Sequence, residues 1–286
     1  MTALIGFSGP LMLQLAETAP ESVTSYSMDK ENFFDILKNM KEASQHDHII
    51  FVMGDLKRIQ ALFKTLSAGH YFRNREKVTM IFADGAKPQW TKPLEQLAVL
   101  ADQVVLMDQY TGDMSGKIVP NAYLPIKQDY WYNDQVKDIG VAFYGATDIY
   151  PERKNTLDYL KENGVDICTD KVPDMMEALC RTKVTINFGN CLSGAECYQN
   201  NYKKFQIKGR VWEAMMAKCV VIEPSNTETK KLFTDGEIIW YDHIKEIPGL
   251  VDKLLKNDDL RQSIANKAFE KARKYADPDI YWSKLL

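Results

Sequence analysis

Two cations and a carboxylate lie close together near the start of a predicted helix. Lys208 and Arg210 begin an amphipathic segment over about 208–217, and Glu213 follows one turn later. A helix presents free N–H groups and the positive end of its dipole at its amino terminus, where anions bind. With two added cations, this end is suited to hold a diphosphate. The alternative is that Lys208 and Arg210 are ordinary surface cations, one of which pairs with Glu213.

Further candidate residues follow the predicted strands of the first half. Ser8 and Gly9 lie in a turn-forming loop after an apolar strand over 3–7, where backbone N–H groups can approach a phosphate. Asp55 and Asp84 each come just after a later strand, and either carboxylate is placed to act as a general base. Each could equally cap the helix that follows it.

A locally basic stretch with aromatic neighbours occupies residues 57–77. It holds six Lys and Arg residues against one acidic residue, and it includes Tyr71 and Phe72. Cations beside aromatic rings pair with phosphates and stack on bases, so this stretch is a candidate surface for nucleic acid. The expected contact residues are Lys57, Arg58, Arg73 and Arg75. The alternative is a solvated helix face and its following loop.

The elements that position these residues alternate between strand and helix. Short apolar runs predict strands, and apolar residues at helical spacing lie between them. In the first half the expected strands span 3–7, 48–53, 77–83 and 103–107, and the expected helices span about 30–43, 56–66 and 94–101. A segment bracketed by prolines, 119–125, marks the crossing to the second half.

The second half repeats the alternation. Its expected strands span 138–144, 165–168, 183–188, 219–222 and 237–241, and its expected helices span 151–163, 173–181, 208–217, 227–233, 243–256 and 258–275. Gly164 lies at the expected end of the first helix. The pattern predicts two doubly wound, Rossmann-like α/β domains, residues 1–124 and 125–286, facing each other across a cleft. Ligands are then expected at the carboxyl ends of the strands.

Composition excludes several classes of protein. With 286 residues, 45% of them hydrophobic and 26% charged, the chain is long enough for two domains and is neither disordered nor low in complexity. No apolar run is long enough to cross a membrane. Five cysteines without a C-x-x-C pair offer no zinc pattern, so we expect reduced thiols. The first residues lack a basic segment and a cleavage-like site, which favours the cytoplasm.

The second half also contains a family-like pattern. Residues 208–222 read K-G-R-V-W-E-A-M-M-A-K-C-V-V-I. This block resembles the carboxyl-terminal domain of GT-B glycosyltransferases and is most similar to the CgeB-like group, which is related to the group 1 or family 4 transferases. The resemblance covers residues 120–286. Its other matching residues are Leu124–Pro125, Phe143–Gly145, Tyr150–Lys154, Glu228, Lys231–Phe233 and Asp235–Gly236.

The resemblance implies an enzyme that moves a sugar from a nucleotide diphosphate sugar, with UDP the expected nucleotide, to an acceptor hydroxyl. It implies that the donor is bound by Gly145, Arg153, Lys208, Arg210 and Glu213, with the ribose hydroxyls on Glu213. We expect Ser8 and Gly9 to contribute to the donor phosphates, and Asp55 or Asp84 to act as the base of an inverting reaction. Cations and helix ends can stabilise the leaving group, so no metal or other cofactor is expected. The one D-x-D sequence, at 277–279, is interpreted as chance.

Two positions depart from the family pattern. Family 4 enzymes carry two glutamates in the spacing E-x7-E, but Phe205 stands eight residues before Glu213, so the stereochemistry stays open. The glycine that usually follows the helix is Lys218.

The acceptor and the reaction class leave alternatives. A hydroxylated base in DNA, as in phage enzymes that modify their own genomes, is one candidate acceptor, and a cell-envelope or spore glycan or a small molecule is the other. A sugar-nucleotide epimerase would share the donor site. A dinucleotide-dependent dehydrogenase is disfavoured because Gly6 and Gly9 do not fit G-x-G-x-x-G, and because Pro10 stands where the helix should open. A binding module without catalytic activity is the last alternative.

Overall fold

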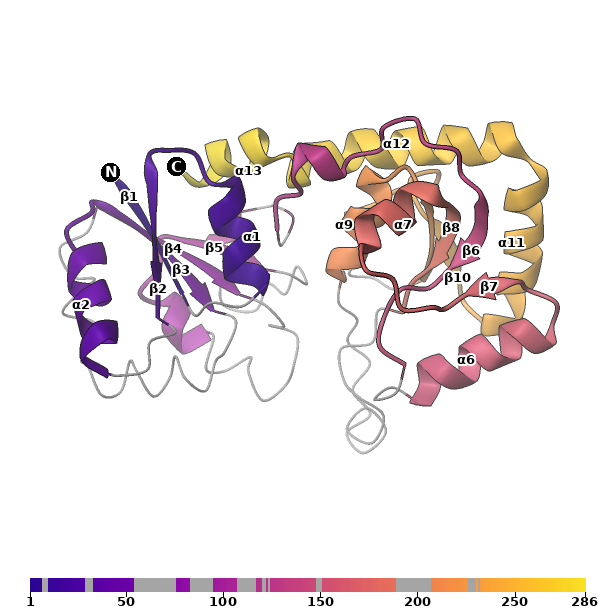
Figure 1. Ribbon diagram of the computed structural model, residues 1–286, viewed down its shortest axis with the longest axis horizontal. Coiled ribbons are helices and arrows are strands. Elements are labelled where there is room, and N and C mark those ends of the chain that lie inside the picture. The colour runs from indigo at the N-terminus through magenta and orange to yellow at the C-terminus, as the bar shows by residue number, and fades with distance from the viewer. Residues whose placement is uncertain are drawn as a thin grey trace. The chain divides into compact units, whose positions relative to one another are not determined.

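The computed structural model describes residues 1–6, 10–28, 33–53, 76–82, 95–106, 117–119, 122, 124–147, 151–188, 207–225, 230 and 232–286 (Figure 1). They form two compact units: unit 1 comprises residues 1–126 and 275–286, and unit 2 comprises residues 127–274. The expected boundary after residue 124 lies two residues from the observed one. The expected second domain, 125–286, needs a correction at its end, because residues 275–286 pack with unit 1.

Unit 1 contains a five-stranded parallel sheet in the order β2-β1-β3-β4-β5. Its strands are β1 (Thr2–Gly6), β2 (Val23–Ser27), β3 (His48–Met53), β4 (Lys77–Phe82) and β5 (Gln103–Leu106), and its helices include α1 (Pro10–Thr18), α2 (Phe33–Ala43) and α13 (Pro278–Leu285). Four of the strands lie within one residue of the predicted bounds. The elements α1, β2 and α13 were not predicted, and the predicted helix over 56–66 lies outside the described residues.

Helices cover both faces of this sheet (Figure 1). Met40 and Ala43 of α2 join a buried cluster with alternate residues of the strands, such as Ile5 and Phe51. On the other face, residues of α1 and α13 bury the opposite set of strand side chains, and this second cluster contains Leu11, Met12, Leu15, Leu4, Ile50, Val52, Tyr281, Trp282 and Leu285. The alternation along each strand therefore produces two apolar faces, as a parallel sheet requires.

Unit 2 contains a second five-stranded parallel sheet, in the order β10-β9-β8-β6-β7. Its strands are β6 (Ile139–Ala142), β7 (Ile167–Cys168), β8 (Thr182–Ile186), β9 (Val220–Pro224) and β10 (Ile239–Tyr241). Its helices are α6 (Pro151–Glu162), α7 (Met175–Arg181), α9 (Gly209–Met216), α11 (Ile247–Lys256) and α12 (Asp258–Ala276, of which 258–274 lie in unit 2), with short 3-10 turns at Gln128–Tyr130 and Ile244–Glu246. Each strand lies within two residues of its predicted bounds.

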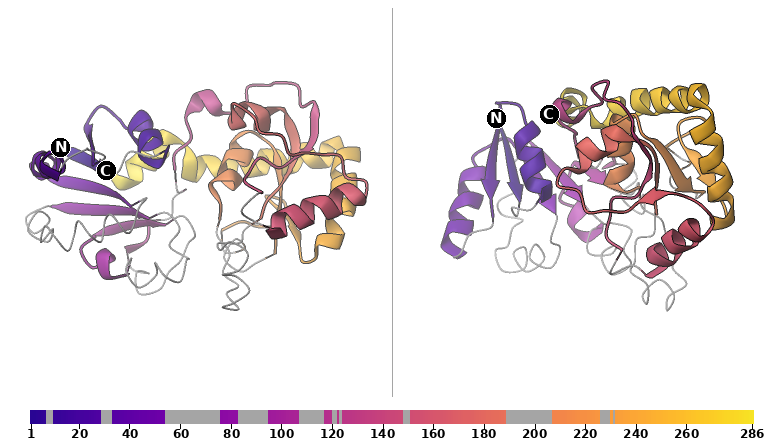
Figure 2. Two further views of the ribbon diagram at one scale, coloured as in Figure 1. Left: turned by 60° about the horizontal axis from the view of Figure 1, so that its bottom comes forward. Right: turned by 45° about the vertical axis from the view of Figure 1, so that its right-hand side comes forward.

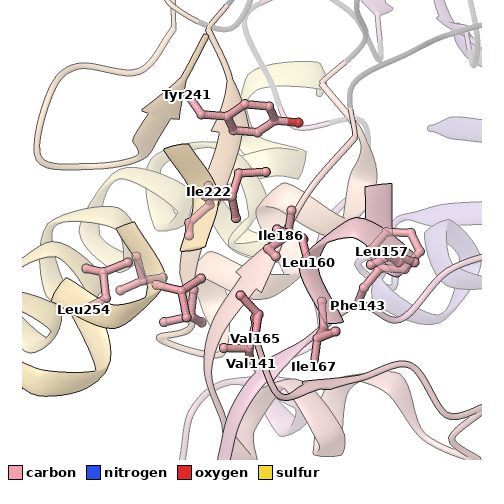
Figure 3. Close-up of a cluster of buried hydrophobic side chains, with 14 of the residues drawn as sticks. Val141, Phe143, Leu157, Leu160, Val165, Ile167, Ile186, Ile222, Tyr241 and Leu254 are labelled. Atoms are coloured by element: carbon pink, nitrogen blue, oxygen red, sulfur yellow. The ribbon is translucent and has the colours of Figure 1, made fainter. Parts of the chain in front are cut away.

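Helices lie on both faces of the unit 2 sheet (Figure 2). One face packs on α6, α11 and α12 through a cluster that includes Val141, Ile186, Leu160 and Leu254 (Figure 3). The other face packs on α7 and α9, whose buried side chains include Met176, Leu179, Val211, Trp212 and Met215. The two units confirm the predicted α/β class with Rossmann-like parallel sheets, whereas the cleft between them stays a prediction.

Three helix ends explain features of the sequence. Gly164, just after α6, has φ +80°, so the predicted glycine end is confirmed. Lys218, just after α9, has φ +50°, a left-handed conformation that explains why glycine is usual there. Helix α1 opens at Pro10, where proline fits because the first N–H of a helix needs no partner. The position of Pro10 where a helix should open is therefore no reason against a helix after β1.

Both sheets share one topology that marks a ligand-binding edge. In unit 2, β7 lies on one side of β6 and β8 lies on the other, so the chain reverses its direction of travel between β6 and β8. In unit 1 the same reversal occurs between β1 and β3. Open parallel sheets bind ligands outside the carboxyl ends of the strands at this point. In unit 2, the residues that follow β6 and β8 are therefore the first place to look for a site.

Candidate functional site

The residues at the carboxyl edge of the unit 2 sheet come from three neighbouring strands. Phe143 follows β6, Asn187 follows β8, and Glu223 lies near the end of β9. The backbone N–H of Asn187 donates to the Ile222 carbonyl oxygen at 2.8 Å, which extends the β8–β9 pairing by one residue. All three side chains are buried. They form the floor of the site.

Arg210, in the first turn of α9, lies over this edge. Its guanidinium carbon stands 4.8 Å from the centre of the Phe143 ring, a cation–π contact. Its Nη1 donates to Asn187 Oδ1 at 3.4 Å. These two contacts place the guanidinium at the switch point between β6 and β8. The structure therefore positions the predicted Arg210 where the topology predicts a ligand.

Gly145 makes room for that guanidinium. A Cβ atom built on Gly145 would overlap Nη2 of Arg210 and would stand 2.9 Å from its Cζ, closer than Cβ contacts in proteins allow. A side chain at this position would therefore have to displace the guanidinium. Gly145 and Arg210, which were predicted separately, belong to one constellation.

The amino terminus of α9 is open to an anion. Lys208 is its N-cap residue, and among the described residues no side chain makes a cap hydrogen bond there. The first turn contains no acidic residue, so no carboxylate competes for the N–H groups and the positive end of the dipole. Burial raises the pKa of the Glu223 carboxyl to about 8, and the positive charges of Arg210 and Lys208 oppose this rise, so their field reaches the sheet edge. This end of α9 thus has the charge and the donors that a phosphate group needs.

Glu213 lies one turn after Arg210 on the same side of α9, as i and i+3 residues do. Burial raises the pKa of its carboxyl, and the charge of Arg210 opposes that rise. The electrostatic effect agrees with the two side chains being neighbours. The structure thus brings Lys208, Arg210 and Glu213 together, and the assignment of Glu213 to a ribose stays a prediction.

Arg153 holds the turn that contains Gly145. It lies in the first turn of α6 with 7% of its surface exposed, and its Nη1 donates to the Ala146 carbonyl oxygen at 3.1 Å. This contact supports the backbone beside the site. The prediction that Arg153 itself binds the donor is not tested by it.

Two residues of the site were not predicted. Asn187 Nδ2 donates to Glu223 Oε2 at 2.5 Å, and Asn187 also contacts Arg210. The signal in the sequence was a polar residue at the end of an otherwise apolar strand, in T-I-N-F and in V-I-E-P. A buried polar side chain needs a partner, so such a residue in a sheet edge points to a network.

Several predicted residues lie outside the described part of the chain. These are Ser8, Gly9, Asp55, Asp84, Lys57, Arg58, Arg73 and Arg75. Of the basic stretch over 57–77, the structure describes Lys77, whose Nζ donates to the Leu285 carbonyl oxygen at 2.6 Å. Lys77 therefore anchors α13 in unit 1.

A cavity of about 620 Å³ lies at the opposite edge of the unit 2 sheet, near the amino ends of its strands. Lys137 and Arg261 are among its lining residues. Lys137 Nζ donates to three backbone carbonyl oxygens at 2.8 to 3.0 Å, and Arg261 pairs with Asp258 at 2.6 Å and bonds the Leu254 carbonyl oxygen. Both cations are engaged in hydrogen bonds to the backbone, so the cavity is a weaker candidate for an anion-binding site than the sheet edge beside Arg210.

The structure also accounts for the D-x-D sequence. Asp277 caps α13, and its carboxylate accepts from the backbone N–H groups of Asp279 and Ile280 at 3.0 and 3.4 Å. Within the described ranges, no group of three or more His, Cys, Asp and Glu side chains is placed to hold a metal ion. None of the helices in the described part of the chain combines the length and apolar character of a membrane span.

The sequence of unit 2 matches a known family. A family described as "Glycosyl transferase-like" matches residues 133–285, more than half of the chain and nearly all of unit 2. The chain belongs to this glycosyltransferase family. The resemblance predicted from the block around Arg210 is thereby confirmed. Comparison with curated proteins finds no match.

Solved structures share the fold over most or all of the chain. Anabaena Alr3699/HepE in complex with UDP-glucose aligns over 99% of this chain and 98% of its own, with TM-score 0.63 and 12% identity. A mutant of T4 phage BGT in complex with UDP-glucose aligns over 99% of both chains, with TM-score 0.52 and 15% identity. A mutant of S. aureus TarM, in complex with fondaparinux, α-GlcNAc-glycerol and UDP, aligns over 82% of this chain and 54% of its own, with TM-score 0.56 and 12% identity.

Proposed function

We propose that this enzyme transfers a glycosyl group from a UDP-sugar to an acceptor hydroxyl, and that the donor diphosphate lies at the amino terminus of α9, against Arg210. The observation that carries the proposal is the position of Arg210 at the β6–β8 switch point, beside a glycine that gives it room. The solved relatives that hold UDP or UDP-glucose support the choice of nucleotide.

The chemistry fits the residues at this edge. Transfer breaks the bond between the sugar and the β-phosphate, and negative charge builds up on the departing diphosphate. Arg210, Lys208 and the amino-terminal N–H groups of α9 supply positive charge where that anion forms. The protein can therefore stabilise the leaving group without a metal ion. Glu213 would bind the ribose, and Asp55 or Asp84 would take the proton of the acceptor hydroxyl.

The decisive experiment for the donor is a screen of nucleotide sugars by mass spectrometry, with and without chelator. We expect at least one UDP-sugar to release UDP, slowly when water takes up the sugar and faster when an acceptor hydroxyl does. Binding or turnover of no nucleotide sugar would refute the proposal. A UDP-sugar that changes its configuration without release of UDP would instead identify a sugar-nucleotide epimerase.

For the acceptor we propose DNA that contains a hydroxylated base. The support is the basic, aromatic stretch over residues 57–77. Duplexes containing hydroxymethylcytosine should gain one sugar mass, and glycan and small-molecule acceptors in the same assay test the alternative. Replacing Arg73 and Arg75 together by Ala should weaken DNA binding and flatten its dependence on salt. An unchanged salt slope would exclude DNA as the partner of this surface.

A further inference from the structure

A chain of three side chains runs from the surface of the site into the unit 2 sheet. Arg210 Nη1 donates to Asn187 Oδ1, and the other end of the same amide, Nδ2, donates to Glu223 Oε2. Asn187 and Glu223 are completely buried. The partner of Glu223 thus fixes which end of the Asn187 amide faces the guanidinium, because an amide presents a donor at one end and an acceptor at the other.

The geometry points to Glu223 as a positioning residue for donor binding: it holds the Asn187 amide with its oxygen toward Arg210, and so keeps the guanidinium aimed at the donor diphosphate. This inference rests on the proposed function. Without Glu223, Asn187 could present its NH2 group to Arg210, and two donors facing each other do not bond.

The surroundings of Glu223 explain how it can act from inside the protein. Burial raises the pKa of this carboxyl to about 8, although the hydrogen bond from Asn187 and the charges of Arg210 and Lys208 lower it. Tyr241, on β10, is another titratable neighbour, and the charge of Glu223 contributes to the raised pKa of its phenol. Within the described residues, Oε1 of Glu223 has no hydrogen-bond partner, so a proton can reside there while Oε2 still accepts from Asn187.

Donor binding and the charge of Glu223 must therefore be linked. A diphosphate beside Arg210 and Lys208 offsets the two cations that favour the ionised carboxylate, so the pKa of Glu223 rises when the donor binds. Donor binding is then accompanied by the uptake of a proton at every pH at which Glu223 is ionised in the enzyme without donor. Donor affinity is accordingly highest below pH 8 and declines as the pH rises above 8, by about tenfold for each unit by which the donor shifts the pKa.

The test compares three variants of the full chain in binding a UDP-sugar. Glu223→Gln keeps the shape and an acceptor oxygen without charge, whereas Glu223→Leu removes the acceptor. Thr185→Val is the matched control, because Thr185 is equally buried on β8 and its Oγ1 donates to the Ala142 carbonyl oxygen at 2.9 Å, away from Arg210. Dissociation constants are measured by calorimetry from pH 6.5 to 9.5.

We expect Glu223→Leu to weaken binding about tenfold at pH 7, the cost of leaving the buried Asn187 amide without its acceptor, while Glu223→Gln and the Thr185 control bind like wild type. The ratio of wild-type to Glu223→Gln affinity should fall above pH 8, and titration of the ligand itself cancels in this ratio. Normal affinity in Glu223→Leu, or a ratio that does not change with pH, would overturn the inference.

An unfolding experiment separates this inference from the proposed function. If wild-type protein binds no UDP-sugar, the donor proposal fails, but the side-chain network can still be examined without ligand. Unfolding constants of Arg210→Met, Glu223→Leu and the double variant then decide. If the network exists, the unfolding constant of the double variant should differ by about fivefold from the value obtained by multiplying the effects of the two single variants. Agreement with that product would refute the coupling.

Discussion

The guanidinium of Arg210 occupies the space in which a side chain on Gly145 would lie. The two residues are 65 positions apart in the sequence. They meet because β6 ends, and α9 begins, at the same edge of the sheet. The glycine thus has a structural reason that concerns the site and not the turn alone. This relationship gives the first prediction.

Gly145→Ala should weaken UDP-sugar binding by about tenfold or more, because the new methyl group displaces Arg210 from the switch point. The measurement is a dissociation constant from calorimetry. Gly249→Ala in α11 is the matched control, since a Cβ there meets no atom within 4 Å, and it should leave binding unchanged. Wild-type affinity in Gly145→Ala would show that the guanidinium can move without loss.

Arg210→Lys should lose most of the donor affinity although it keeps the charge. A guanidinium can bond Asn187 and a phosphate at once, whereas an ammonium is a flexible point charge. We expect kcat/KM to fall by about 10- to 100-fold, as for a lost hydrogen bond between charged groups. Lys256→Met, which removes an exposed cation of α11, should have no effect. Wild-type kcat/KM in Arg210→Lys would show that the positive charge alone is enough at this position.

Asp277→Ala should destabilise unit 1 by about 1 kcal/mol, because α13 loses its cap. Asp277→Asn preserves an acceptor oxygen and should retain most of the stability. The midpoint of denaturant unfolding measures both. Neither substitution should alter the response of transfer to added chelator. Transfer that requires a divalent metal and loses it in Asp279→Ala would contradict this structural explanation of the D-x-D sequence.

Unit 1 should lose stability as the pH falls from 6.5 to 4. His48 is buried on β3 and bonds Thr79 at 2.9 Å, and burial, with the charge of Lys77, lowers its pKa to about 4. Folding favours the neutral imidazole of His48. The free energy of unfolding is therefore highest above pH 6.5 and falls by on the order of 2–3 kcal/mol as the pH drops to 4.

Unfolding midpoints of wild type and His48→Gln at several pH values test this. The variant should show a shallower decline between pH 6.5 and 4, because it has no buried histidine to protonate. His243→Gln, at an exposed histidine, is the control and should decline like wild type. Parallel curves for wild type and His48→Gln would contradict a role for His48.

The strands of the sheets could be predicted because parallel strands are buried on both faces and so appear as short apolar runs. The run H-I-I-F-V-M became β3 without a shift at either end. Edge strand β2, V-T-S-Y-S, was missed because it is only partly buried and has a polar sequence. Helix α13 was missed because the sequence alone does not show that residues 275–286 return to unit 1.

The site was predicted in part for a similar reason. Arg210 and Glu213 are close in sequence, so their helix spacing was enough to bring them together. Asn187 follows β8 and Glu223 lies on β9, and only the pairing of these two strands makes them neighbours. A network that crosses a sheet depends on strand order and register, which the spacing of residues along one segment does not contain.

The return of α13 to unit 1 also bears on the order in which the protein matures on the ribosome. Unit 2 is a continuous stretch and can complete its core as soon as it has emerged. Unit 1 emerges first but must wait for Tyr281 and Trp282, which cover Leu4 and Ile50 and are made after the whole of unit 2. The half of the enzyme that is made first is therefore the half that finishes folding last, with an apolar surface that chaperones can bind in the meantime.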